Sequence, residues 1–104
     1  MNDILLSTEK LEKAAYILKT VAHPLRLGIV DILRNRDKVS VNEICQILDS
    51  EQSLTSHHLN NLRAGGLLGF VKEGKQVYYF LKFKEVSLII DCIQQCDTQN
   101  FNLK

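Results

Sequence analysis

Four neighbouring polar side chains carry most of the hydrogen-bonding chemistry in the middle of the chain. They are Gln52, Ser53, Ser56 and His57. At 3.6 residues per turn, positions 53, 56 and 57 share one face of a helix, and Leu59 and Leu62 lie on the opposite face. The pattern predicts an amide, two hydroxyls and an imidazole presented to a partner at the start of a helix. The alternative is an ordinary solvated polar face.

The three cysteines are the other reactive groups. Cys45 falls on an apolar helical face, where packing is its expected role. Cys92 and Cys96 are four residues apart, so on a helix their thiols lie on one face. Such a pair can bind a metalloid or respond to an oxidant, and it can equally be two small apolar residues in a packed seam. Both interpretations stay open.

No combination of residues predicts an enzyme. The chain has no phosphate-binding loop, no H-E-x-x-H pair and no nucleophile elbow. The adjacent His57 and His58 point to different sides of a helix, so they do not form one site. We therefore expect a binding protein rather than a catalyst.

Size and charge set broad limits. The chain has 104 residues, enough for one domain, and a formal net charge of +1. Residues 1–50 carry seven basic and seven acidic residues, and residues 51–80 carry three basic and two acidic residues. Charge alone therefore does not predict nucleic-acid binding. We expect a cytoplasmic protein with reduced thiols, because the sequence shows neither a basic, apolar leader nor an apolar run of about 20 residues.

Apolar spacing and end signals predict five helices. They cover residues 7–21, 24–34, 41–48, 53–64 and 83–97. Ser7 is the expected N-cap of the first helix, and Pro24 suits the first turn of the second. Ser40 begins a capping box for the third helix, Ser53 is expected to cap the fourth, and Gly66 is expected to end it in a left-handed conformation.

Two β segments, 67–72 and 76–81, flank a turn with Gly74 and predict a hairpin. The break of about four residues before position 53 has the length of a helix-turn-helix turn. The prediction is one domain over 1–104, mainly α with a small β-hairpin wing, in the order α-α-α-α-β-β-α. It is a winged helix-turn-helix with the helix-turn-helix over 41–64, the wing over 67–81 and a polar tail over 98–104. Arg34, Arg36 and Lys38 are expected to be solvated in a turn.

Three segments in this order resemble ArsR/SmtB-type bacterial transcription regulators. Ala22–Leu27 (AHPLRL) resembles the A-x-P-x-R-L segment of that family. Ser56–Leu67 (SHHLNNLRAGGL) is similar to its S-x-H-L-x-x-L-R-x-A-G-L signature, with Gly65 where Ala is usual. Lys72–Tyr79 (KEGKQVYY) is similar to its R-x-G-x-x-x-x-Y wing, with Lys72 in the Arg position. The resemblance covers about residues 10–97 and implies a repressor that leaves operator DNA when a metal, metalloid or redox species binds.

In a helix-turn-helix, the start of the second helix meets base edges in the major groove. The expected base-reading residues are therefore Gln52, Ser53, Ser56 and His57. Three basic residues are expected to contact the DNA backbone: Arg63, Lys72 and Lys75. Strand-edge protection is the alternative for the two lysines, and complementing the helix dipole is the alternative for Arg63. His58 is expected to pack beside the buried stripe.

The small basic excess favours a homodimer on a palindromic DNA operator, because two subunits double the phosphate contacts. The helices over 7–21 and 83–97 are the expected dimerisation helices. Their candidate interface residues are Leu11, Tyr16, Leu18, Ile89, Cys92, Ile93 and Cys96.

The metal positions of the family are altered here. Its E-L-C-V-C-D-L site aligns with residues 38–44, where Ser40 and Asn42 replace the two thiols, and these are poor ligands for soft metals. Its second site aligns with Phe83, Glu85, Cys96 and Gln99, of which only Glu85 and Cys96 are good ligands. No cofactor is therefore expected, while metal or metalloid binding and sensing by Cys92 and Cys96 stay open. The alternative function is a winged-helix protein-interaction module without DNA binding.

Overall fold

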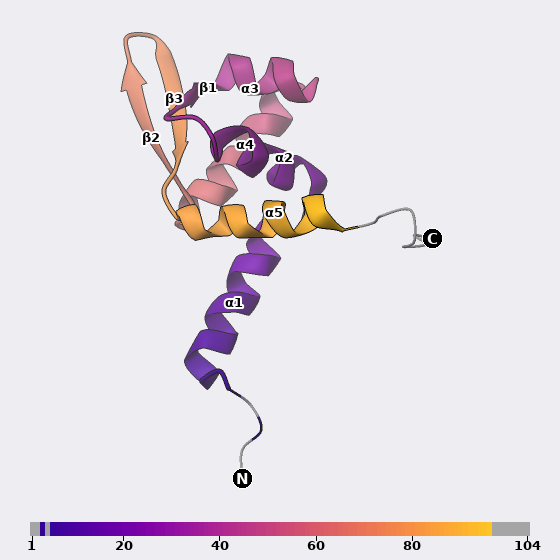
Figure 1. Ribbon diagram of the computed structural model, residues 1–104. Coiled ribbons are helices and arrows are strands. Elements are labelled where there is room, and N and C mark those ends of the chain that lie inside the picture. Colours follow the sequence, from indigo (N-terminus) through magenta and orange to yellow (C-terminus); the bar gives the residue numbers. More distant parts are fainter. Residues whose placement is uncertain (1–2, 4, 97–104) are drawn as a thin grey trace.

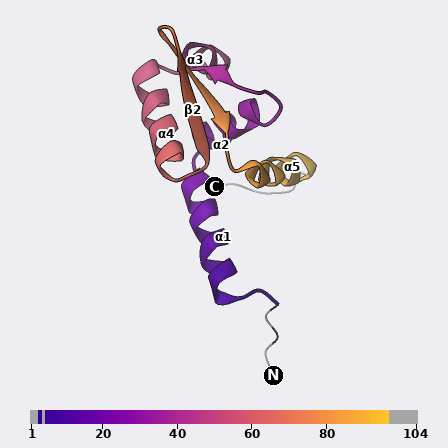
Figure 2. The same cartoon turned by 90° about the vertical axis from the view of Figure 1, so that its left-hand side faces the viewer.

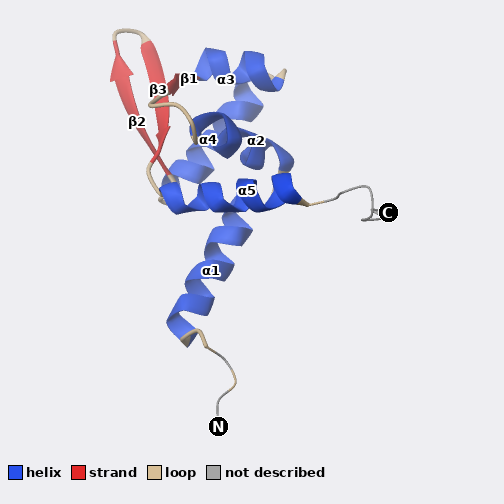
Figure 3. Ribbon diagram, viewed as in Figure 1, coloured by secondary structure: helices blue, strands red, loops and turns tan. Residues whose placement is uncertain are grey.

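The computed structural model describes residue 3 and residues 5–96. Within this part of the chain, five α-helices and a three-stranded antiparallel sheet form the fold (Figure 1, Figure 3). In chain order the elements are α1 (Thr8–Val21), α2 (Pro24–Leu33), β1 (Val39–Ser40), α3 (Val41–Leu48), α4 (Gln52–Ala64), β2 (Leu68–Glu73), β3 (Gln76–Leu81), a 3-10 turn (Lys84–Val86) and α5 (Ser87–Gln95). The predicted mainly helical fold with a β-hairpin wing is confirmed. None of the described helices is long and apolar enough to cross a membrane.

Local hydrogen bonds and backbone conformations begin and end the elements at predicted places. The Ser7 and Ser40 hydroxyls each accept from the backbone N–H three residues ahead, at 3.1 and 3.2 Å. Pro24 is the first residue of α2. Gly66 after α4 has a φ of 89° and Gly74 in the hairpin turn has a φ of 63°, a region that glycine enters without steric cost. These short signals separate the helices and set the hairpin.

Several predicted element ends are wrong. α4 begins at Gln52 with Glu51 as its N-cap, and Ser53 instead donates its hydroxyl to the Glu51 carboxylate at 3.4 Å. The last helix begins at Ser87 because a tighter 3-10 turn precedes it, and it ends at Gln95. Residue 97 and the predicted tail over 98–104 lie outside the described residues.

The strand β1 is not among the predicted elements. Its two residues pair with β3, Val39 opposite Tyr79 and Ser40 opposite Tyr78, and give the strand order β1-β3-β2. A two-residue strand has no periodicity of its own, so its existence depends on the partner strand. β1 attaches the start of α3 to the wing.

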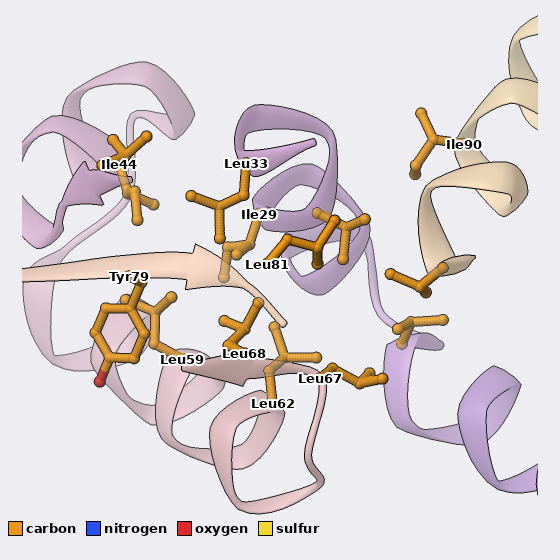
Figure 4. Close-up of a cluster of buried hydrophobic side chains, with 14 residues drawn as sticks. Ile29, Leu33, Ile44, Leu59, Leu62, Leu67, Leu68, Tyr79, Leu81 and Ile90 are labelled. Carbon is orange, nitrogen blue, oxygen red and sulfur yellow. The ribbon is translucent and has the colours of Figure 1, made fainter. Parts of the chain in front are cut away.

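One face of α4 packs against the hydrophobic core (Figure 4). Thr55, Leu59 and Leu62 on this side have no exposed surface. The core cluster that contains Leu59 and Leu62 also holds side chains from α2, α3, both hairpin strands and α5: Ile29, Leu33, Ile44, Leu68, Leu81 and Ile90. Each fully buried leucine stabilises the fold by about 1.5–3 kcal/mol. The position of α4 is therefore set by its buried face.

Helix α1 projects away from the rest of the protein (Figure 1, Figure 2). Within α1, all of which the structure describes, Val21 alone is buried. Leu11, Tyr16 and Leu18 of its predicted apolar stripe are 42%, 52% and 54% exposed. The radius of gyration is 15.6 Å, above the about 13 Å of a compact domain of this length. The stripe is thus present but uncovered in a single protomer.

Candidate nucleic-acid interface

The first two turns of α4 present the predicted polar face to solvent. Gln52, Ser53 and His57 are exposed, and Ser56 is half-buried. Ser53 and His57 lie opposite the buried face of α4 described above, and Gln52 and Ser56 lie beside it. The ring atom Nε2 of His57 lies 3.2 Å from Nδ2 of Asn61, one turn further along the helix. The hydrogen-bonding groups are accessible on a helix that cannot rotate without unpacking the core.

The turn between α3 and α4 sets the direction in which the polar face of α4 points. Asp49 ends α3 in the left-handed region, with a φ of 51°. The backbone N–H of Ser50 then donates to the Cys45 carbonyl at 3.1 Å. The hydroxyls of Ser50 and the buried Thr55 are 2.6 Å apart, which joins the turn to the first turn of α4. The start of α4 is therefore fixed relative to α3.

The N-terminus of α4 keeps unpaired donors. Glu51 is its N-cap residue and makes no side-chain capping hydrogen bond. The first N–H groups of a helix have no partner within the helix, and the helix dipole makes this end partly positive. An uncapped N-terminus can therefore donate to a phosphate.

His58 is buried and does not belong to the polar face formed by Gln52, Ser53, Ser56 and His57. It is 5% exposed, and its Nδ1 accepts a hydrogen bond from Nε of Arg26 at 3.0 Å. Burial lowers the pKa of His58, and repulsion of the charged ring by His23, Arg26 and His57 lowers it further. The predicted packing role of His58 is confirmed.

The wing lies beside α4 and is attached to it at two points (Figure 2). The phenol of the buried Tyr79 donates to Oδ1 of Asn60 at 3.4 Å. The guanidinium carbon of Arg63 lies 5.2 Å from the centre of the exposed Phe70 ring. Contacts from two strands therefore hold the hairpin against the helix.

The exposed cations of the wing have no carboxylate partner. Lys72 lies on β2 and Lys75 in the hairpin turn, and both are exposed. Among the residues that the structure describes, Lys72, Lys75 and Arg63 take part in none of the ion pairs. Glu73, the carboxylate of the wing, pairs with Lys38. This ion pair neutralises the negative charge of Glu73 near Lys72 and Lys75.

The prediction that the turn cations are simply solvated is wrong. Arg34 pairs with Asp31 and Asp91, Arg36 pairs with Glu43, and Lys38 pairs with Glu73. Asp91 and Glu73 are distant in sequence from the cations that they pair with, so no local pattern signals these two partners. The positive charge left near α4 is carried by the wing and by Arg63.

Two further residues at the start of α4 escape the sequence prediction. Leu54 is 43% exposed beside the polar face, where an aliphatic side chain can contact a thymine methyl group. Glu51 is exposed and can accept from a cytosine amino group. The signal for Leu54 is its offset from the leucines at 59 and 62, which places it off the buried stripe.

The thiols and the altered metal positions are spread over the fold. Cys45 is half-buried on α3, and Cys92 and Cys96 are exposed on α5 and at its C-cap. Ser40 caps α3, Asn42 and Glu85 are exposed, Phe83 is half-buried, and Gln99 lies outside the described residues. Within the described part of the chain, no group of three or more His, Cys, Asp and Glu residues is placed to hold a metal ion.

Sequence comparison finds relatives of this chain among transcriptional regulators. A family model described as "Bacterial regulatory protein, arsR family" matches residues 23–69. The transcriptional repressor PagR of Bacillus anthracis is 41% identical over 80 residues, which cover 77% of this chain and 80% of PagR. The cadmium resistance transcriptional regulatory protein CadC of Listeria innocua is 42% identical over 64 residues, 62% of this chain and 54% of CadC. The match thus spans about half the length of CadC.

Solved structures agree with this relationship. HlyU from Vibrio cholerae matches with a TM-score of 0.77 at 34% identity, over 86% of this chain and 96% of HlyU. The transcriptional repressor PagR of Bacillus anthracis matches with a TM-score of 0.72 at 37% identity, over 84% of this chain and 99% of PagR. From its sequence motifs, its winged helix-turn-helix fold and these relatives, the chain belongs to the arsR family of bacterial regulatory proteins, which are transcriptional regulators and not enzymes.

Proposed function

We propose that this protein is a sequence-specific DNA-binding transcriptional repressor that acts as a homodimer on a palindromic operator in the cytoplasm. The observation that carries the proposal is the start of α4, where exposed polar side chains and uncapped N–H groups lie opposite a fully buried face. A helix anchored in this way can enter the major groove without being reshaped. The repressor PagR is a relative over most of this chain.

Base recognition falls to the side chains of the first two turns of α4. The amide of Gln52 can bond an adenine at two positions, and the Ser53 and Ser56 hydroxyls can bond several bases. His57 can donate to a guanine acceptor or to a phosphate. Leu54 adds an apolar contact suited to thymine.

Backbone contacts come from the unpaired cations and the helix end. Lys72 and Lys75 are exposed on the wing, Arg63 is exposed on the last turn of α4, and the N-terminus of α4 offers N–H groups. Each neutralised phosphate adds to the salt dependence of binding. Three cations per protomer make only a modest contribution, so two protomers on one operator are needed for tight binding.

The dimer is supported by the uncovered apolar surface of α1 and α5. Leu18 and Tyr16 on α1 and Leu88 and Ile93 on α5 are large and exposed. An isolated helix of 14 residues is marginal in water, and α1 has little of its surface packed in one protomer. A two-fold related copy would cover these residues and give the pairing of reading helices that a palindrome requires.

The signal, on this proposal, acts at Cys92 and Cys96. Both thiols are exposed; Cys92 lies on α5, the helix proposed for the dimer interface, and Cys96 is its C-cap residue. An oxidant can take two protons and two electrons from two thiols to form a disulfide, and As(III) can bind thiolates directly. No resident cofactor is proposed, because Ser40 and Asn42 occupy the positions of the family thiols.

The first prediction tests base reading with the intergenic DNA beside the gene as the probe. We expect the wild-type chain to shift this DNA, and Gln52→Ala and Ser56→Ala each to weaken binding by about 1–3 kcal/mol, because each removes a hydrogen bond to a base. Gel-shift titration measures the affinity. Asn35→Ala, which removes an exposed amide in the loop after α2, is the control. Wild-type affinity in the Gln52, Ser56 double variant would reject these residues as readers.

The second prediction concerns the wing. Replacing Lys75 with Ala is expected to weaken binding to all DNA sequences about equally and to lower the slope of log affinity against log salt by about 1 per protomer, because one phosphate contact is lost. Lys82→Ala removes the same charge at the base of the hairpin and serves as the matched control. A change in sequence preference on losing Lys75 would contradict a backbone role.

The third prediction concerns assembly. Leu18→Asp is expected to convert the dimer to a monomer in sedimentation velocity, because it places a carboxylate in the apolar seam. Ile47→Asp is the matched control, since Ile47 is 47% exposed on α3, away from that seam. A wild-type monomer at micromolar concentration, or an unchanged dimer in Leu18→Asp, would contradict the proposed interface.

The fourth prediction concerns the thiols. Adding As(III) or a thiol oxidant is expected to release the wild-type protein from DNA, and the Cys92→Ser, Cys96→Ser double variant is expected to stay bound. Fluorescence anisotropy of labelled DNA measures the release. Cys45→Ser, which keeps both α5 thiols, is the control and is expected to behave as wild type. Release of the double variant under the same conditions would remove the support for sensing at these positions.

A further inference from the structure

Hydrogen bonds, two of them part-buried, connect α4, which carries the proposed base-reading residues, to α1, which projects from the protomer. Arg26, on α2, donates from Nε to Nδ1 of His58 on α4 at 3.0 Å and from Nη1 to the carbonyl of Thr20 on α1 at 2.9 Å. Nearby, the Tyr16 phenol on α1 donates to the Gly65 carbonyl after α4 at 3.0 Å. Arg26 therefore bridges the C-terminal turn of α1 and the middle of α4.

This connection requires an uncharged His58 ring. Nδ1 accepts from a guanidinium, which is a donor only, so the ring proton must sit on Nε2. An imidazolium has two donors and no acceptor, and it would also meet the positive charge of Arg26 at close range. Protonating His58 thus replaces the hydrogen bond between Arg26 and His58 with repulsion between two positive charges.

Among the described residues, no acidic group is among those that shift the pKa of His58. In the described part of the chain, the titratable and charged groups that face the ring are His23 before α2, Arg26 on α2 and His57 on α4. The ring of His23 lies 4.3 Å away between centroids and that of His57 lies 5.4 Å away. Burial lowers the pKa of His58 below its ordinary value, and these three groups lower it further.

We infer that His58 is a positioning residue for operator binding, and that acid breaks its bond to Arg26 and weakens operator affinity. The inference rests on the proposed function, since α1 is the proposed dimer helix and α4 the proposed reading helix. Two reading helices must lie about 34 Å apart along the DNA. The angle between α1 and α4 sets that distance, and the Arg26–His58 bond is one of the contacts that hold the angle.

The sign of the pH effect follows from the two states of the ring. Since the pKa of His58 is lowered in the folded protein, the unfolded or unlocked chain takes up the proton more readily. Stability from the connection is complete above the ordinary histidine pKa of about 6.5 and is lost as pH falls through the lower folded value.

The experiment compares wild type with His58→Asn, since both keep His57 and His23 and their difference isolates His58. The Asn Oδ1 can accept from Arg26 and does not titrate. Affinity for the intergenic DNA is measured from about pH 8 to about pH 5.5. We expect wild type to lose about tenfold more affinity over this range than His58→Asn. His58→Ala, which lacks the acceptor, is expected to bind more weakly at both pH values, with Asn restoring binding.

The outcomes separate this inference from the proposed function. Wild-type protein that fails to bind DNA at about pH 8 overturns the proposed function and the inference with it. Binding with parallel pH profiles for wild type and His58→Asn overturns the inference alone. Should His58→Asn not fold, nitrogen NMR of wild-type imidazoles decides: a neutral ring with its proton on Nε2 at neutral pH and a midpoint below 6.5 supports the inference, and a proton on Nδ1 overturns it.

Discussion

The burial of one face of α4 is the constraint on which the rest of the structure depends. Thr55, Leu59 and Leu62 have no exposed surface, and the core on this side of α4 is completed by apolar side chains from α2, α3, both hairpin strands and α5. Because the helix cannot turn without losing this packing, the opposite face is held in a fixed direction. The polar groups at its start are therefore preorganised for a rigid partner such as the major groove.

Several basic side chains of this protein are neutralised by ion pairs, and the protein carries little net positive charge. The net charge is only +1, and the three cations between α2 and β1 are paired with carboxylates from α2, α3, the wing and α5. Each exposed ion pair stabilises the fold little, but it removes a charge from the surface. Among the cations of the described residues that have no carboxylate partner are Lys72 and Lys75 on the wing and Arg63 on the last turn of α4. A weakly charged protomer is thereby given a local positive edge.

Polar contacts connect α1, the helix that projects from the protomer, to α4. α1 has little surface packed in the protomer, so its direction depends on polar contacts at its base, among them Arg26 to Thr20 and Tyr16 to Gly65. The same arginine contacts His58 on α4. In a dimer built on α1, these contacts would relate the two-fold axis to the reading faces. On the proposed function, a change at this junction would alter operator binding without touching any of the residues proposed to contact DNA.

The sequence by itself determined the helices, the hairpin and the polar face at the start of α4, because caps, glycines with positive φ and apolar periodicity act over a few residues. Ser7, Ser40, Gly66 and Gly74 are such signals. Only the tertiary structure decided the pairing of β1 with β3, the partners of most turn cations and the bond from Arg26 to His58. These contacts join residues far apart in the chain, and the packing of the whole core brings them together.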